Sequence, residues 1–440
     1  MMVVTNSSPY LLILAAGCLA AAAQVTQPQV LDLPTEGPLA VPRVAHSKIN
    51  LLTMSWRVSS DFDDNALNGA QTQQGDLVTS IQPRLGWQVF RPRLEWAVDY
   101  TPGFYRSRNF SAYDSLSHVL DGRFQVKLAK RLRLLVRESF LKSANPFDQL
   151  QSFGTTAGAP GRAVTNETAP VTPADVRTEQ AKGDILYSLS AHSTVGFGGE
   201  FFSGNYSLPS HVEPANQVLQ DSSSVAGHGY YIRQVTRHQW TGLEYDVRKS
   251  IFNSGQSWSL VHSLVYTHTI TLSPPLTLAF FAGPERSLAQ NVNATFTSLP
   301  PFFAGEQTAW HWSGGVTGRW SGMRTIITAA VSRRVSDGGV LGAVQLSRAS
   351  AELTRQLGRQ WSASLLASYD DSRSLAGPSA LFYASAASGL TYRLAPNLSL
   401  QLRYWREHLS GSSSLPSGFL ADHNRIAIAL IYELEYPLGR

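Results

Sequence analysis

Apolar residues occupy every second position in a long series of short segments that runs from Leu51 to the end of the chain. Successive side chains of a β-strand point to opposite faces, so a period of two predicts strands with one apolar face. The clearest pair flanks Arg91, and its apolar positions are Leu85, Trp87, Val89, Leu94, Trp96, Val98 and Tyr100. The pattern predicts an all-β chain built of antiparallel hairpins.

The last of these segments, from Asn424 to Tyr436, alternates most regularly. One face is apolar and ends in aromatic residues, and its members are Ile426, Ile428, Leu430, Tyr432, Leu434 and Tyr436. The other face starts with small residues and ends with Glu433 and Glu435. A half-buried strand of a soluble sandwich has the same pattern, so this segment alone leaves both kinds of protein open.

The lengths of the connections separate these alternatives. Short turns are expected at Arg91, Lys130, His192, Arg237, Pro274, Gly322, Gly358 and Pro396. The connections between them are polar and mostly longer, at residues 59–76, 102–114, 142–183, 203–227, 250–257, 284–308, 336–341, 371–379 and 407–422. Transmembrane barrels have short turns on one side and long loops on the other. A soluble sandwich or propeller has no reason to alternate short turns with long loops. The alternation therefore predicts a closed transmembrane antiparallel up-and-down β-barrel.

Counting the hairpins gives about 18 strands, within a range of 16–18, and an even number places both chain termini on one side. In the segments 258–272, 325–333 and 342–356 both faces look apolar or mixed, so their sides stay unassigned. Aromatic residues lie towards the expected strand ends, where they suit the interfaces of a bilayer. These residues are Trp87, Trp96, Tyr100, Trp310, Trp320, Tyr369, Tyr392, Tyr404 and Tyr436.

Composition agrees with a membrane barrel. The 440 residues are 43% hydrophobic and 15% charged, whereas an average chain has about 25% charged residues. The body of the chain contains no apolar stretch long enough for a transmembrane helix. The formal net charge of +5 is modest, and the absence of a Lys/Arg block argues against nucleic acid as a partner.

The first residues have the pattern of a secretory signal peptide, assigned to 1–23. An apolar core at 10–16 precedes the small residues Ala21, Ala22 and Ala23, although the segment lacks an early Lys or Arg. Cys18 is the only cysteine, and processing there as a lipoprotein is the alternative. Residues 24–50 are rich in Pro and Gln and are expected to form a flexible periplasmic lead-in. The barrel is assigned to 51–440.

Together, the signal peptide, the hairpin series and the terminal pattern of Ile428, Leu430, Tyr432, Leu434 and Tyr436 resemble bacterial outer-membrane β-barrels of porin-like size. The resemblance implies an integral outer-membrane protein surrounded by lipid, with both termini periplasmic and a possible homo-oligomeric state. It also implies that the last strand is the signal read by the barrel-assembly machinery. Tyr436 departs from the usual pattern because it is not the final residue.

Alternation predicts a polar, lumen-facing set of side chains. Its charged members are Arg57, Arg84, Arg93, Glu95, Asp99, Arg123, Lys127, Arg133, Arg137, Glu200, Arg319, Arg393, Arg403, Glu433 and Glu435. Pairs of Arg and carboxylate across strands would brace the wall, whereas a pore lining rich in Arg would favour anionic or polar solutes. The connection 142–183, with several Gly and Pro residues, either narrows the lumen or lies outside the barrel.

The resulting hypothesis is a passive or weakly selective pore for small polar or anionic solutes, with no enzymatic activity and no cofactor. One alternative is a surface-exposed anchoring or adhesion barrel without transport. A second is a membrane-embedded hydrolase that uses Ser263 with His262 or His268, although the chain has no Gly-x-Ser-x-Gly motif.

One segment has the features of a possible metal-binding site. Asp61, Asp63 and Asn65 have the spacing of the first oxygen ligands of a Ca²⁺ loop. Ala66 and Thr72 stand where an EF-hand needs Gly and Glu, which excludes that motif and leaves only a looser surface Ca²⁺ site as an alternative. The prediction is therefore no metal.

Overall fold

The computed structural model describes residues 49–66, 74–111, 114–143, 175–207, 221–252, 257–291, 306–337, 343–375, 380–411 and 421–438. The expected signal peptide and the expected lead-in up to residue 48 lie outside these residues, as does most of the connection 142–183, whereas Ile49 and Asn50 belong to the first strand. Among the described residues, no helix is long and apolar enough to cross a membrane.

The described residues form one 18-stranded sheet. Its strands are β1 (Ile49–Asp63), β2 (Asp76–Phe90), β3 (Leu94–Ser107), β4 (Ser115–Lys127), β5 (Leu132–Ser143), β6 (Asp175–Ser188), β7 (Ser193–Ser207), β8 (Ser222–Thr236), β9 (Gln239–Phe252), β10 (Ser257–Ser273), β11 (Leu276–Asn291), β12 (Glu306–Ser321), β13 (Thr325–Asp337), β14 (Ala343–Gln356), β15 (Trp361–Ser374), β16 (Ala380–Ala395), β17 (Leu398–Gly411) and β18 (Ala421–Pro437).

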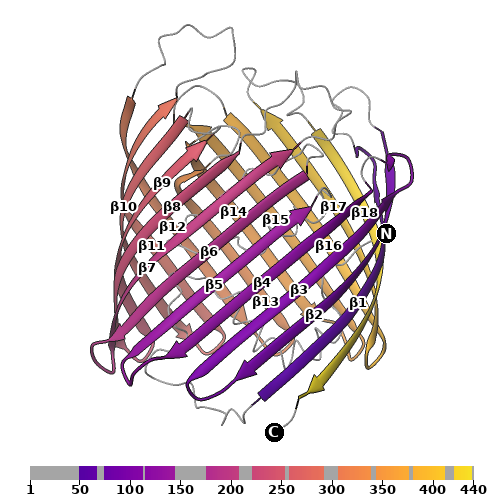
Figure 1. Cartoon of the computed structure of the whole chain (residues 1–440), viewed down its shortest axis with the longest axis horizontal. Coiled ribbons are helices and arrows are strands. Elements are labelled where there is room, and N and C mark those ends of the chain that lie inside the picture. The colour runs from indigo at the N-terminus through magenta and orange to yellow at the C-terminus, as the bar shows by residue number, and fades with distance from the viewer. Residues whose placement is uncertain are drawn as a thin grey trace, which may run out of the picture.

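The sheet closes on itself. Each strand pairs with its neighbours in the chain, and β1 also pairs antiparallel with β18, from Leu51 opposite Pro437 to Asp63 opposite Arg425. Figure 1 shows β1 and β18 side by side in the barrel wall. Closure leaves no unpaired sheet edge, which is the condition for a sheet to cross hydrocarbon. The predicted closed antiparallel barrel is confirmed.

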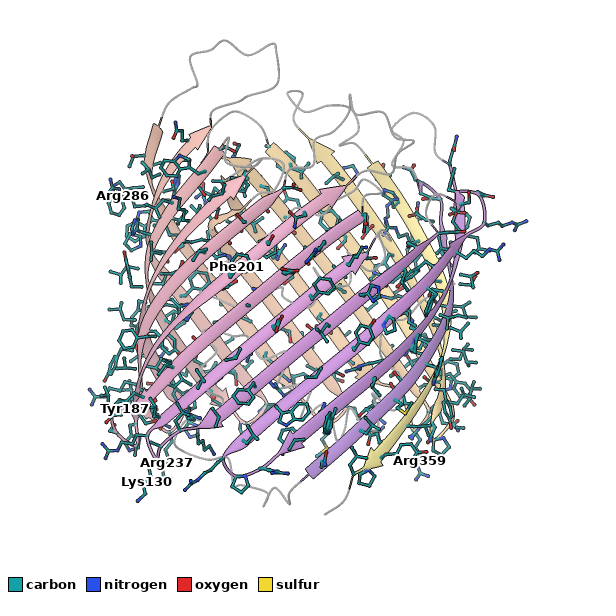
Figure 2. All side chains as sticks on the ribbon, viewed as in Figure 1. Lys130, Tyr187, Phe201, Arg237, Arg286 and Arg359 are labelled. Atoms are coloured by element: carbon teal, nitrogen blue, oxygen red, sulfur yellow. The ribbon has the colours of Figure 1, made fainter. Side chains whose placement is uncertain are left out.

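Alternation separates the two faces of the wall as expected. On β1, Trp56 and Val58 are exposed, whereas Ser55, Arg57 and Ser59 are buried. In Figure 2, Tyr187 and Arg286 project away from the outside of the barrel, and the strand registers place Trp56 and Val58 on that same outer face. The exposed large apolar side chains therefore form the outer surface, and the polar side chains line the interior.

Every predicted short turn is present, but the strands extend further at the opposite end than expected. For example, β7 continues to Ser207 and β11 to Asn291, through stretches that the sequence analysis assigned to loops. A strand of 15 residues is about 50 Å long, and at a tilt of about 40° it rises about 38 Å. The apolar band of such barrels is only about 25 Å tall. Beyond the apolar band the outer face no longer needs apolar side chains, so the regular alternation in hydrophobicity fails there.

Because the strands are longer than expected, two of the nine aromatic residues predicted at strand ends do not lie there. Trp87, Trp96, Trp320, Tyr392 and Tyr436 do lie beside the short turns, and the rings of Trp87 and Trp96 meet edge to face at 4.4 Å. Trp310 and Tyr369 lie towards the opposite end. The longer strands leave two of the nine in mid-strand, namely Tyr100 and Tyr404.

The segments whose sides the sequence left unassigned have apolar residues on the inner face as well. Val261 and Val265 of β10 and Val344 and Leu346 of β14 point inward and are buried. Val344 and Leu346 pack with Leu381 and Leu409 in one apolar cluster of the inner wall. Neither face of such a strand is clearly polar, which is why alternation alone could not orient it.

Candidate functional site: the inner wall of the barrel

The strand registers place most of the predicted lumen set on the inner face. These residues are Arg57, Arg84, Glu95, Asp99, Arg123, Lys127, Arg133, Arg137, Glu200, Arg319, Arg393, Arg403, Glu433 and Glu435. Arg93 is different, because it lies in the short turn between β2 and β3 and is exposed. Minimal turns interrupt the strand period, so a residue next to one cannot be assigned a face by alternation.

Near the short turns, several inner arginines pair with carboxylates across neighbouring strands. Arg84 Nη2 of β2 lies 2.7 Å from Asp99 Oδ1 of β3, and Arg123 Nη2 of β4 lies 3.6 Å from Glu95 Oε1. A Cβ at Gly86 would come within 2.6 Å of Asp99 Oδ1, so this glycine leaves room for the carboxylate. These pairs match the bracing arrangement expected for part of the set.

A different arrangement occurs where β4 meets β5. Arg123 lies directly opposite Arg137, and Lys127 lies directly opposite Arg133, all on the inner face. Like charges directly opposite each other destabilise a sheet. We call these four residues the basic cluster. Arg123 also braces the wall through Glu95, but the four cations outnumber that carboxylate and concentrate positive charge on one stretch of the inner wall near the short turns.

A buried network of the inner wall crosses the closure between β1 and β18. Arg425 Nε lies 2.8 Å from Asp63 Oδ2, and Arg425 Nη1 lies 3.3 Å from Glu407 Oε2. His423 Nδ1 is 3.1 Å from Asp63 Oδ1, and the Tyr383 hydroxyl donates a hydrogen bond of 2.9 Å to Glu407 Oε1. The side chains of the two ion pairs are all less than a tenth exposed. This closure network joins the first strand to the last three.

A second buried network joins β6 to β9. His228 Nε2 lies 2.6 Å from Asp184 Oδ1, and Lys182 Nζ lies 3.7 Å from Asp184 Oδ2. A Cβ at Gly198 would approach both Asp184 Oδ1 and His228 Nε2 to 2.5 Å, so only glycine leaves room for this contact. Next to it, Arg248 Nη2 is 3.6 Å from Glu200 Oε2. The carboxylates and cations here are held by one another.

Two further buried contacts lie on the β11–β15 side. Arg348 and Asp370 form a two-point ion pair at 2.6 and 2.8 Å, the geometry that guanidinium and carboxylate groups favour. Glu285 Oε2 accepts a hydrogen bond of 2.8 Å from the backbone N–H of Val335. The inner wall thus carries fixed charges of both signs on most of its circumference.

Alternation missed residues of these networks for two reasons. Asp63, Glu285 and Glu407 lie in stretches expected to be loops, and Arg348 lies on a strand whose sides could not be assigned. Continuing the odd–even count beyond the last apolar residue of each strand would have placed Glu407 and Asp63 on the inner face. The partnership of Asp63 with Arg425 had no sequence signal, because 362 positions separate the two residues.

The structure separates the residues of the hydrolase alternative. Ser263 faces inward opposite Asp246 and Glu285, whereas His262 faces outward, where its Nδ1 lies 2.8 Å from the Tyr245 hydroxyl. His268 also faces outward, and its ring stacks on Phe280 at 5.0 Å. A general base must reach the nucleophile, and neither histidine is on the same face as Ser263.

The two carboxylates of the Ca²⁺ alternative, Asp61 and Asp63, both face inward and are buried among protein partners. Asp61 Oδ2 accepts a hydrogen bond of 2.8 Å from Ser59 Oγ, and Asp63 contacts Arg425 and His423. Among the residues that the structure describes, no group of three or more His, Cys, Asp or Glu side chains could hold a metal ion.

No protein-family model and no curated protein matches this sequence. Among solved structures, OccAB4 of Acinetobacter baumannii is similar at 10% identity, with 89% of this chain and 99% of that chain covered and a TM-score of 0.46. OccK2 (OpdF) of Pseudomonas aeruginosa is 11% identical over 88% of this chain and 98% of that chain, with the same TM-score. OprD of the same organism is 11% identical over 89% and 97%, with a TM-score of 0.43. The likeness is one of barrel architecture, and one architecture supports many functions through different side chains.

Proposed function

We propose that the protein is an outer-membrane pore that passes small polar solutes by diffusion and prefers anions. The observation that carries the proposal is a closed wall of 18 strands with an apolar outer face and a charged inner face. Barrels of 16 to 18 strands are wide enough to leave an aqueous channel. Transport then requires no chemical step, only a wetted lumen and a field that favours some solutes.

The anion preference rests on the basic cluster rather than on an overall excess of arginine. Carboxylates such as Glu244, Asp246 and Glu285 also face inward, so cations and anions are broadly balanced around the wall. In the basic cluster, Arg123 and Arg137 face each other, and this stretch offers a solute more positive than negative charge. Rings or patches of fixed charge of one sign select the opposite sign in a pore.

The experiment is single-channel recording of the purified protein in a planar lipid bilayer, with reversal potentials measured across a KCl gradient. We expect stable stepwise currents with a preference for chloride. In the double variant Arg123→Gln/Arg137→Gln, the currents should persist while the reversal potential moves towards that of potassium. The matched control is Arg237→Gln, which removes an exposed cation from the short turn between β8 and β9 and should leave selectivity unchanged.

Two results would contradict the proposal in different ways. A folded, inserted barrel that stays electrically silent would remove the pore and favour the anchoring alternative. Stepwise currents whose reversal potential is the same in wild type and double variant would keep the pore but remove the role of the basic cluster.

We also propose an orientation, with the short turns and both chain termini in the periplasm and the long connections outside the cell. This is the arrangement of single-chain barrels with an even number of strands. The described end of β18, at Pro437, lies on the short-turn side (Figure 1).

A further inference from the structure

The outer wall over β11 to β15 carries a groove of about 720 Å³. Most of its lining belongs to the outer face by strand register: Phe280, Gly314, Val316, Val331, Arg333, Ser347, Ala349, Tyr369 and Asp371. The floor is low because Gly314 and Ala349 present little or no side chain between larger neighbours. Large exposed apolar side chains cover much of the outer wall.

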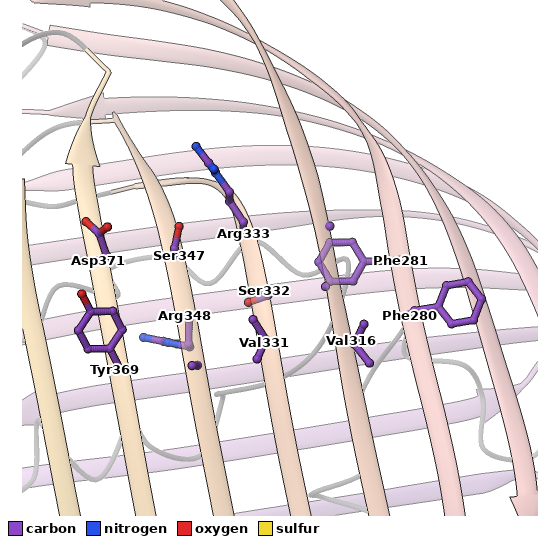
Figure 3. A pocket seen from close by; sticks show the side chains of 13 residues that line it. Phe280, Phe281, Val316, Val331, Ser332, Arg333, Ser347, Arg348, Tyr369 and Asp371 are labelled. Atoms are coloured by element: carbon purple, nitrogen blue, oxygen red, sulfur yellow. The ribbon is translucent and has the colours of Figure 1, made fainter.

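The groove is amphipathic along the barrel axis. Figure 3 shows Val331, Val316 and Tyr369 in its lower part, with Arg333, Ser347 and Asp371 above them. The upper residues are closer to the ends of β13 and β15, at Asp337 and Ser374, on the side opposite the short turns. An occupant therefore meets apolar side chains at membrane depth and polar groups at the level of the lipid headgroups.

The polar end of the groove is positively charged. Arg333 is exposed, and its Nη2 donates a hydrogen bond of 2.6 Å to Gln345 Oε1, a neutral group. Asp371 is compensated by Arg373, whose Nη2 lies 2.9 Å from Asp371 Oδ2. The positive charge of Arg333 thus remains available at the mouth of the groove. A guanidinium beside a neutral amide is suited to a phosphate group, which it can bind through two N–H donors.

The backbone pairing of β13 also changes at Arg333. The ladder between β12 and β13 ends at the pair Gly314 and Arg333, although both strands continue beyond it. Above this point β13 remains paired with β14, and the N–H of Val335 donates to the inward-facing Glu285 on β11. Arg333 is therefore the last residue of β13 that pairs with β12, directly above the apolar floor.

We propose that this groove binds one lipid of the outer leaflet that carries phosphate on its headgroup, with an acyl chain on the Val316–Val331–Ala349 floor and the phosphate at Arg333. The proposal rests on the membrane location and the orientation proposed above, but not on the pore. Charge complementarity favours a phosphate-bearing lipid as the occupant. A lipid without net charge would contact the apolar floor but would gain no binding free energy from Arg333. Basic side chains near a membrane surface add affinity for anionic lipids.

The test is native mass spectrometry of the purified full-length barrel in detergent, titrated with diphosphorylated lipid A or, separately, with phosphatidylcholine. We expect one tightly retained lipid A and weaker retention of phosphatidylcholine. Arg333→Gln should reduce lipid A binding about fivefold, which corresponds to about 1 kcal/mol for one arginine near the surface. Ala349→Trp should fill the floor and reduce binding of both lipids.

The matched control is Lys249→Gln, which removes an exposed cation from the outer face of β9, away from the groove. It should leave retention unchanged. An equal loss of lipid A binding in Lys249→Gln and Arg333→Gln would overturn the proposal, because it would show a general attraction of lipid A to the whole outer surface instead of a specific site. Equal retention of the two lipids by the wild type would also overturn the proposal.

Two further outcomes identify other occupants. Displacement of lipid A by excess inorganic phosphate would assign the site to the free anion, and a dimer that Ala349→Trp disrupts would assign the groove to a second copy of this chain. Folding of each variant is checked by heat-modifiable gel mobility. Single-channel currents of Arg333→Gln should match those of the wild type, because the groove lies outside the lumen. A failed pore and a failed lipid site are thus distinguishable.

Discussion

Replacing Arg425 with Met should destabilise the barrel strongly, because Arg425 is the cation that joins the two ends of the sheet. Its guanidinium lies 2.8 Å from Asp63 Oδ2 on β1 and 3.3 Å from Glu407 Oε2 on β17. Methionine keeps much of the length of the side chain and removes the charge. Asp63 and Glu407 would then remain as two buried carboxylates that have lost their shared cation.

The magnitude follows from the geometry and the burial of the three groups. A pair of unit charges about 4 Å apart gains roughly 4 kcal/mol at an effective dielectric constant near 20, and Arg425 makes two such pairs. Desolvation offsets part of this gain, but removal of one partner of a buried ion pair typically costs about 3–5 kcal/mol. With a urea dependence of about 3 kcal/mol per M, the unfolding midpoint should fall by roughly 1–2 M.

The assay is urea unfolding of the barrel in lipid vesicles, followed by tryptophan fluorescence and gel mobility. Arg373→Gln serves as the control, because it removes the cation of an exposed ion pair, with Arg373 66% exposed, and should leave the midpoint unchanged. Adding Asp63→Asn and Glu407→Gln to Arg425→Met should recover much of the loss, since the stranded charges are gone. A midpoint for Arg425→Met equal to that of Arg373→Gln would contradict the assigned role of Arg425, as would a triple variant no more stable than the single one.

Two predictions concern orientation and assembly. With Cys18 replaced by Ala, a membrane-impermeant maleimide added to intact cells should label Arg108→Cys, near a long connection, but not Lys130→Cys, in a short turn; the reverse pattern would invert the proposed topology. Tyr436→Ser should lower the amount of folded barrel in the outer membrane, because Tyr436 is the exposed terminal aromatic of β18 and the expected contact for the barrel-assembly machinery. Leu438→Ser, just beyond β18, is the matched change, and an equal loss in both variants would remove the specific role of Tyr436.

The elements that the sequence predicted well share one physical origin. Where a strand crosses hydrocarbon on one side and water on the other, its residues must alternate, so Trp56 faces outward and Arg57 inward. The short turns were found for the same reason, because Arg91 and Pro274 interrupt that alternation between two apolar runs. The sequence did not predict the upper parts of the strands. Near Ser207, for example, both faces of β7 lie in water, so hydrophobicity has no period of two there.

Local periodicity in the sequence was therefore enough to predict about 18 strands, the short turns and the faces of those strands that have one clearly apolar side. Which inner charges meet depends on the folded barrel. Asp63 contacts Arg425 because the sheet closes. The groove that includes Val331 exists because the small residues Gly314 and Ala349, from different strands, lie in the same part of the outer wall. Contacts between residues hundreds of positions apart depend on strand register and closure, and these are set by the pairing of whole strands rather than by any single segment.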